Sequence, residues 1–177
     1  MATLSELITL VRERLTGGPS ASVSDDLISH IIESVVASAY PDWYELKSAL
    51  YDATAEDNSY DLPDDAKDIV RVMRIEADGT HYPLTGWNVA DGVLILKSPF
   101  TGTLQVDYTA APQVDSVPQA YIIPKAAAQT LWVMAQAEAE PNSKLILIQH
   151  ARYLDGESEN ARRRYRMHWP TAFRRKW

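Results

Sequence analysis

The chain has 177 residues, of which 46% are hydrophobic and 23% are charged, and it contains no cysteine. These values are typical of a globular protein, and a chain of this length buries enough surface to fold without disulfides. The lack of cysteine excludes thiol nucleophiles, disulfide frameworks and cysteine-ligated metal sites. Residues 1–18 are amphipathic and include acids, so we expect no secretory signal, and no apolar run is long enough to predict a transmembrane helix.

The charge is distributed unevenly along the chain. The net charge is −7, yet residues 162–177 hold seven Lys or Arg and no acid, which leaves −14 on residues 1–161. An acidic body argues against broad binding to nucleic acid. A basic end is typical of a segment that contacts an anionic partner.

The first forty residues predict two helices. Apolar residues recur at helical spacing from Leu4 to Leu15, which predicts a helix over residues 3–16 that Gly17-Gly18-Pro19 ends. Ser24 is suited to cap a second helix over residues 25–40, which Pro41 ends.

Between residues 43 and 110 the pattern changes to short apolar runs separated by turns. Alternation from Leu104 to Tyr108 predicts a half-buried strand, and we expect two more strands at Val93–Leu96 and at residues 69–77. The segment Glu45–Ala53 fits a helix or a strand, and we interpret it as a strand. Together these segments predict a small antiparallel sheet.

Helical spacing returns after a Pro-containing linker and predicts helices over residues 118–140 and 143–165. Pro124 lies near the start of the first helix or kinks it, Pro141 ends it, and Ser143 is suited to cap the second. We therefore predict an α+β fold: a bundle of about four helices with a small antiparallel β-sheet inserted between the second and third. Residues 1–161 are expected to form a single domain, with the sheet insertion at residues 43–110, and residues 162–177 a basic aromatic C-terminal arm.

Catalytic motifs are absent from the sequence. There is no Walker loop, no G-x-G-x-x-G, no G-x-S-x-G and no H-E-x-x-H. His30 and His150 each lie within a predicted helix without a second His or a Cys nearby, which favours a structural role. We therefore expect no enzyme activity and no cofactor.

Two acidic segments have the composition of cation sites. Asp61, Asp64 and Asp65 supply carboxylates that would suit Ca²⁺ or Mg²⁺. Leu62 precedes Pro63 and must be extended, however, and the flanking aspartates are common turn residues, so a structural role is favoured. Residues 155–160 lack the spacing of a calcium loop and are interpreted as a solvated helical face. We expect no metal site.

The C-terminal arm carries the clearest signal for a partner. Tyr165, Trp169, Phe173 and Trp177 are four residues apart, and Pro170 argues against one uninterrupted helix. Aromatic and arginine side chains dominate interface hot spots, whereas these rings have too few aliphatic neighbours to form a core. The alternatives are docking on the chain's own acidic body and binding of a phosphate backbone. The expected partner-binding residues are Arg162, Arg163, Arg164, Tyr165, Arg166, Trp169, Phe173, Arg174, Arg175 and Trp177.

Three motifs carry a resemblance to a known family. They are Tyr60-Asp61-Leu62-Pro63-Asp64-Asp65 leading into Ile69-Val70-Arg71-Val72, the Asp78-Gly79 hairpin with Tyr82-Pro83-Leu84, and Gly102-Thr103-Leu104-Gln105-Val106-Asp107-Tyr108. With these motifs the chain resembles tailed-bacteriophage head-to-tail adaptor, or connector, proteins. In that family a Y-x-L-P-D-D element precedes a strand that reaches a D-G turn, and a G-T-L-x-V-x-Y strand closes the sheet. The similarity spans about residues 27–165 and leaves the arm outside it.

The resemblance implies a non-enzymatic structural virion protein. Such proteins form a homo-oligomer ring, commonly a dodecamer, between the portal protein and the next tail or stopper protein. The implied location is the head–tail interface of a virion, after synthesis in the host cytoplasm and without contact with a membrane. The arm would then dock to the portal.

The acidic body suits a DNA channel in such a ring. Carboxylates facing the lumen repel phosphates, so double-stranded DNA would pass without sequence-specific binding. Residues expected at the channel or the subunit interface are Asp57, Asp61, Asp64 and Asp65. Two alternatives stay open: a nucleic-acid-binding module that uses the basic tail, and a stopper or tail-completion ring of the same particle.

Overall fold

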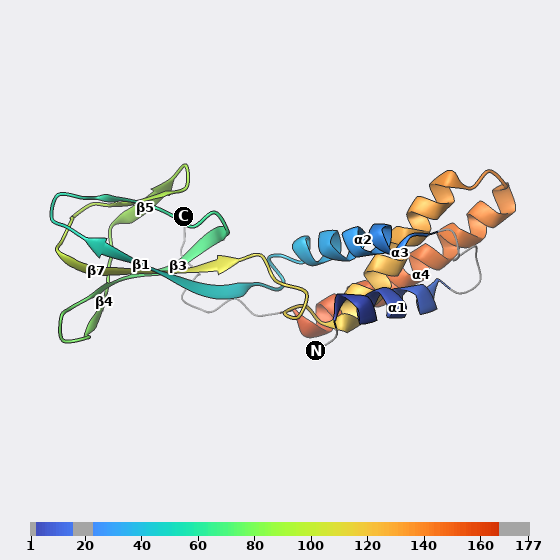
Figure 1. Ribbon diagram of the computed structural model, residues 1–177, viewed down its shortest axis with the longest axis horizontal. Helices are drawn as coiled ribbons and strands as arrows, with labels where there is room; N and C mark the ends of the chain where they lie inside the picture. The colour runs from blue at the N-terminus through green and yellow to red at the C-terminus, as the bar shows by residue number, and fades with distance from the viewer. Residues whose placement is uncertain (1–2, 16–22, 167–177) are drawn as a thin grey trace. The chain divides into compact units, whose positions relative to one another are not determined.

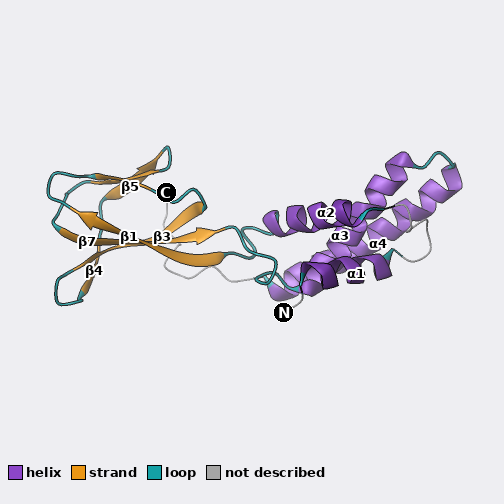
Figure 2. Cartoon of the chain, viewed as in Figure 1, coloured by secondary structure: helices purple, strands orange, loops and turns teal. Residues whose placement is uncertain are grey.

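The computed structural model describes residues 3–15 and 23–166 and has an α+β fold (Figures 1 and 2). Two helices precede a β insertion and two follow it, which confirms the predicted fold class. The sequence predicted one domain over residues 1–161. That domain count stays a prediction, and the structure describes two compact units in the chain, each with its own apolar core: a helical unit, which ends at Tyr44 and resumes at Pro112, and a β unit over Glu45–Ala111.

The helical unit contains four helices in its described residues. They are α1 (Leu4–Arg14), α2 (Asp25–Ala37), α3 (Gln119–Ala137) and α4 (Pro141–Tyr165). Thr3 and Glu6 form a capping box at the start of α1, and the Ser24 hydroxyl accepts a hydrogen bond from the Leu27 amide at the start of α2. The N-cap predicted for the second helix is therefore confirmed.

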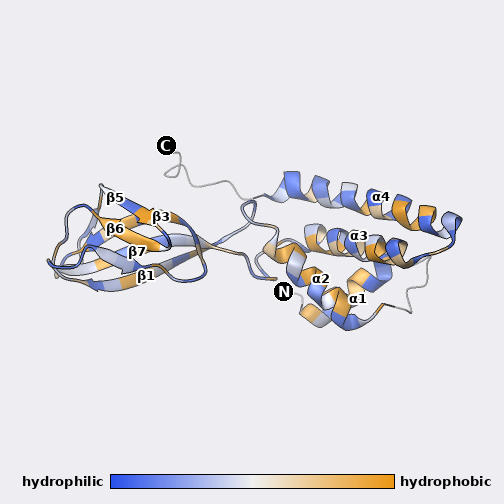
Figure 3. Ribbon diagram, turned by 90° about the horizontal axis from the view of Figure 1, so that it is seen from above, coloured by the Kyte–Doolittle hydropathy of each residue, from blue (hydrophilic) through white to orange (hydrophobic). Residues whose placement is uncertain are grey.

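Apolar faces of all four helices meet in one core. Ile32, Leu131 and Leu154 are almost fully buried there, and the three consecutive alanines at 126–128 of α3 are also buried. Small side chains at these positions allow the neighbouring helices to approach closely. Figure 3 shows that α4 has hydrophobic patches among hydrophilic residues in its first half and mainly hydrophilic residues towards its end.

The ends of the helices differ from the prediction. α2 ends at Ala37, three residues early, and α3 ends at Ala137. Pro141 does not terminate α3 but is the first residue of α4. The N–H of a residue at this position makes no hydrogen bond within the helix, so proline, which has no N–H, is tolerated there. The cap is Glu140 rather than Ser143, since the Glu140 carboxylate accepts a 2.6 Å hydrogen bond from the Ser143 amide. Pro124 lies inside α3.

The β unit contains two antiparallel sheets. Its strands are β1 (Glu45–Ala53), β2 (Ser59–Asp61), β3 (Ala66–Ile75), β4 (His81–Pro83), β5 (Trp87–Ala90), β6 (Val93–Leu96) and β7 (Gly102–Ala110). One sheet has the order β1-β7-β3-β4 and the other β2-β6-β5. The strand interpretation of Glu45–Ala53 is confirmed, whereas the expectation of a single sheet is wrong.

The second sheet packs against the apolar inner face of the first sheet. Leu104 and Val106 on β7 and Leu94 on β6 are fully buried, and they belong to one core cluster with residues of both sheets. β6 is short and apolar, and the hairpin that joins it to β5 turns at Asp91 and Gly92, with φ values of 52° and 78°. Positive φ at both positions matches the twist of a tight hairpin.

We expect Leu104→Ala to destabilise the β unit by about 2–5 kcal/mol, because it leaves a cavity in a fully buried site. The matched control is Leu50→Ala on β1. That leucine is 65% exposed, so in dilute solution the substitution should change the free energy of unfolding by no more than about 0.5 kcal/mol. Urea denaturation followed by circular dichroism measures both. Equal effects would contradict the assignment of the core.

Candidate functional site

The predicted arm begins inside a helix. α4 continues to Tyr165, and Arg166 is its C-cap, so Arg162–Arg166 belong to the end of a long helix of the folded body. Residues 167–177, which include the predicted partner-binding residues Trp169, Phe173, Arg174, Arg175 and Trp177, lie outside the described residues.

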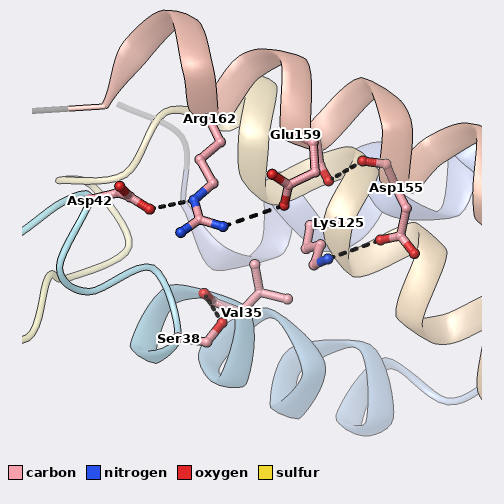
Figure 4. A network of polar contacts seen from close by, with 8 residues as sticks. Val35, Ser38, Asp42, Lys125, Asp155, Glu159 and Arg162 are labelled. Atoms are coloured by element: carbon pink, nitrogen blue, oxygen red, sulfur yellow. Dashed lines mark hydrogen bonds and ion pairs between the residues drawn. The ribbon is translucent and has the colours of Figure 1, made fainter.

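Arg162 is held by the helical unit (Figure 4). Its Nε donates a short hydrogen bond to the Asp42 carboxylate, which lies in the segment after α2, and its Nη1 lies 3.6 Å from Glu159 Oε1. The hydrogen bond to Asp42 raises the pKa of the guanidinium. Arg162 therefore links the last turns of α4 to the segment that follows α2.

An aromatic contact holds the same turn of α4. Trp43 is 2% exposed, and its indole Nε1 donates a 3.1 Å hydrogen bond to the backbone carbonyl of Tyr165. The Trp43 ring packs against Tyr121 of α3 with 4.8 Å between ring centroids. Since a carbonyl in the last turn of a helix has no helical partner, the indole satisfies a group that would otherwise need water. Apart from the residue types, no pattern in the sequence indicates this contact.

A second polar link joins α3 to α4. Lys125 Nζ lies 3.0 Å from Asp155 Oδ1, and Trp132 Nε1 lies 3.5 Å from the other carboxylate oxygen (Figure 4 shows the lysine contact). Asp155 therefore faces the bundle. Residues 155–160 are helical, as expected, but Asp155 and Glu159 are half-buried and engaged rather than solvated.

Three arginines at the end of α4 remain available. Arg163, Arg164 and Arg166 are exposed, and none has an ion-pair partner within the described residues. Positive charge near a helix C-terminus is favoured by the helix dipole. Together with Tyr165, whose surface is 48% exposed, they form the basic end of α4, a surface able to pair with carboxylates or phosphates.

The predicted acidic residues occupy the start of the β unit. Asp57 accepts a 2.9 Å hydrogen bond from Thr54, and Asp65 accepts bonds from Lys47 Nζ at 2.8 Å and Tyr108 OH at 3.2 Å. The bond from Lys47 holds the pKa of Asp65 below its usual value. All four residues are exposed, and Asp57 and Asp65 have local structural partners, whereas within the described residues no hydrogen bond or ion pair to the carboxylates of Asp61 and Asp64 is seen.

One cluster was missed by the sequence analysis. On the face of the four-stranded sheet away from the second sheet, Asp107 of β7 accepts hydrogen bonds from three strands. The donors are Ser48 Oγ at 2.6 Å, Gln105 Nε2 at 2.7 Å, and Arg71 through Nε at 2.8 Å and Nη2 at 2.6 Å. The alternation of apolar and polar residues along β7 indicates that Asp107 lies on the solvent side of the strand. The donors Ser48 and Arg71 come from the neighbouring strands β1 and β3, whose pairing with β7 the alternation does not predict.

Asp107 is ionised despite its low exposure of 7%. Burial opposes ionisation of this carboxyl, but the hydrogen bonds from Ser48, Gln105 and Arg71 together outweigh it and lower the pKa below the ordinary value. The cluster consequently stabilises the sheet in its charged form.

Within residues 3–15 and 23–166 there is no group of three or more His, Cys, Asp or Glu side chains placed to hold a metal ion. In the same described ranges, no helix is long and apolar enough to cross a membrane. His30 is exposed on α2, and His150 is half-buried on α4.

No family model and no curated protein matches the chain. Among solved structures, the chain is similar to a chain of the assembly described as "Neck of empty GTA particle computed with C6 symmetry". The two share 16% sequence identity with a TM-score of 0.37, and the match covers 85% of this chain and 88% of that chain. A likeness at this TM-score does not establish a shared fold.

We expect Arg162→Ala to destabilise the helical unit by about 0.5–1 kcal/mol, since it leaves Asp42 without its cation in a partly exposed ion pair. The neighbouring Arg163 is the matched control, because it has no such partner in the described part of the chain, and Arg163→Ala should change stability by no more than about 0.5 kcal/mol. Thermal unfolding of both variants tests this. An Arg163 variant as unstable as the Arg162 variant would show that helix propensity, not the ion pair, matters.

Asp107→Asn should lower the free energy of unfolding at neutral pH by about 1–3 kcal/mol, because charged hydrogen bonds are lost. The pKa of Asp107 is depressed in the folded state, so its contribution is present above the unfolded pKa and is lost as pH falls through the folded pKa. The difference between wild type and variant should therefore shrink at about pH 3. Urea titrations at both pH values measure it, with the exposed Asp52→Asn as control. A pH-independent difference would contradict this account.

Proposed function

We propose that this protein is a non-catalytic structural component of a virion that forms a ring between the capsid portal and the tail and lines the DNA passage. One observation carries the proposal: the motifs of the resemblance fall on successive elements of the β unit. Tyr60–Asp65 spans β2 and the turn into β3, Asp78-Gly79 forms the turn between β3 and β4, and residues 102–108 lie in β7, the strand before α3.

The charge of the β unit supports a place beside DNA. Residues 45–111 hold 12 acids and five Lys or Arg. The exposed carboxylates of Asp61 and Asp64 would repel phosphates and so allow a duplex to slide, whereas a basic lining would bind it. Asp65 and Asp57, with their local partners, are better suited to shape this surface or a subunit contact.

Portal docking is assigned to the basic end of α4 together with the arm that follows it. Arg163, Arg164 and Arg166 supply cations without an ion-pair partner among residues 3–15 and 23–166, and the rings of Trp169, Phe173 and Trp177 would fill pockets on the portal. Arg162 has a different part: through Asp42 it holds the last turns of α4, from which the arm continues.

A nucleic-acid-binding module is the second candidate, because three exposed arginines on one helix end also suit a phosphate backbone. A stopper or tail-completion ring of the same particle differs from the adaptor only in its position.

The test is to mix the purified protein with portal rings and image the product by electron microscopy. We expect a ring of copies seated on the portal. A variant that lacks residues 169–177 should lose most of this association, because the aromatic anchors are gone. Unchanged association would contradict the arm assignment, and the absence of any ring would contradict the proposed function.

Two further variants separate the candidates. Replacing Trp169, Phe173 and Trp177 by Ala keeps every charge and should weaken portal binding as the deletion does. Changing Arg163, Arg164 and Arg166 to Gln tests the cations. Duplex DNA affinity that falls steeply with salt, and is lost in the Gln variant, would favour the nucleic-acid module instead.

A further inference from the structure

β1 is a long edge strand that pairs with only one described strand. Its nine residues pair with β7 in a continuous register, from Glu45 opposite Ala110 to Ala53 opposite Gly102, with no bulge. Proteins usually protect such edges with a proline, a bulge or a very short strand. β1 has none of these, and its lysine, Lys47, is paired with Asp65, so along Leu46–Leu50 its outer edge can serve as a template for another strand.

Two apolar side chains lie on the exposed face of β1. Leu46 and Leu50 are 57% and 65% exposed, and they flank Ser48 on the same face. Lys47 lies on the opposite face, where its Nζ is 2.8 Å from Asp65, so its charge is already balanced. Two exposed leucines on an unprotected edge indicate a surface that another chain covers.

The polar groups beside these leucines need no new partner. Ser48 donates to Asp107, and the same carboxylate binds the Arg71 guanidinium. A strand placed along the edge of β1 would therefore lie beside Leu46 and Leu50 and leave these polar contacts as they are.

The pattern of β1 is complementary to itself. In antiparallel pairing about a two-fold axis at Ser48, Leu46 faces Leu50 of the second copy and Leu50 faces its Leu46, while Lys47 faces an alanine. Moving the axis to Lys47 would bring two like charges together, and moving it to Ala49 would place Leu46 opposite Asp52. An axis at Leu46 or at Leu50 would pair one leucine with its own symmetry mate, whereas the axis at Ser48 pairs both leucines, and a two-fold contact of this kind is the commonest in oligomers.

We propose that β1 is the contact between two copies of this chain, which pair antiparallel with Ser48 facing its symmetry mate and extend the four-stranded sheet across the axis. The contact is small, so the dimer is weak and forms at high protein concentration. The inference goes beyond the proposed function, because it concerns the protein in the absence of a portal. It is therefore tested separately from ring formation on a portal.

Disulfide trapping in the full chain tests the register, because the native sequence has no cysteine. Ser48→Cys should form a covalent dimer on mild oxidation, since facing residues on antiparallel strands are about 4.5–5.5 Å apart between Cα atoms. Leu46→Cys should not, because its symmetry mate is four residues away, about 14 Å. The double variant Leu46→Cys/Leu50→Cys should form dimers again. Ser98→Cys, in an exposed loop, is the control for random collision.

Sedimentation of the variants tests the contact without a covalent bond. Leu50→Lys should weaken dimerisation about tenfold or more, because two cross-strand pairs are lost per dimer. Ile146→Lys is matched to it, since Ile146 is 61% exposed on α4, and it should dimerise like wild type. Circular dichroism confirms that each variant is folded.

The outcomes are distinct. Trapping of Leu46→Cys alone as efficiently as Ser48→Cys, trapping of no β1 variant above the Ser98→Cys level, or equal dimerisation of the two lysine variants would overturn the inference. Ring formation of Leu50→Lys on portal rings reports on the proposed function alone.

Discussion

The attachment of the end of α4 to the helical unit is the constraint on which the functional surfaces depend. Arg162 pairs with Asp42, and the Trp43 indole binds the Tyr165 carbonyl. Both contacts act on the last turns of a helix, where backbone carbonyls lack helical partners and fraying is easiest. Because these turns are held, the basic end of α4 and the start of the arm have a defined place on the helical unit.

The arginines at the start of the arm differ in their contacts and therefore in the roles open to them. Arg162 is committed to a carboxylate of its own chain, whereas Arg163, Arg164 and Arg166 are exposed without an ion-pair partner in the described part of the chain. A partner surface can therefore meet three cations on a helix that is already ordered, which lowers the entropy lost on binding relative to a wholly unstructured tail. The carboxylates of the β unit differ in the same way: Asp65 is paired with Lys47, whereas no such pair is seen for Asp61 and Asp64 in the described part of the chain.

Much of the architecture could be predicted from local pattern. Ser24 was correctly assigned as a cap, β6 was placed at Val93–Leu96, and the four helices and the β insertion followed in the right order, because these features depend on neighbours within a few residues. Pro141 was misassigned because a proline at the first position of a helix and one just after a helix have the same local signal. The second sheet escaped prediction because the pairing of strands depends on contacts distant in sequence.

The amino-acid sequence by itself determined the fold class, the excess of acid in the body, the basic aromatic end and the absence of thiol chemistry, since composition and short-range periodicity suffice for these. Only the tertiary structure decided that Arg162 faces Asp42 across 120 residues, that three strands converge on Asp107, and that β1 is an edge strand among the described strands. Each of these depends on which distant segments lie side by side, and that is set by the packing of the whole unit rather than by any local run of residues.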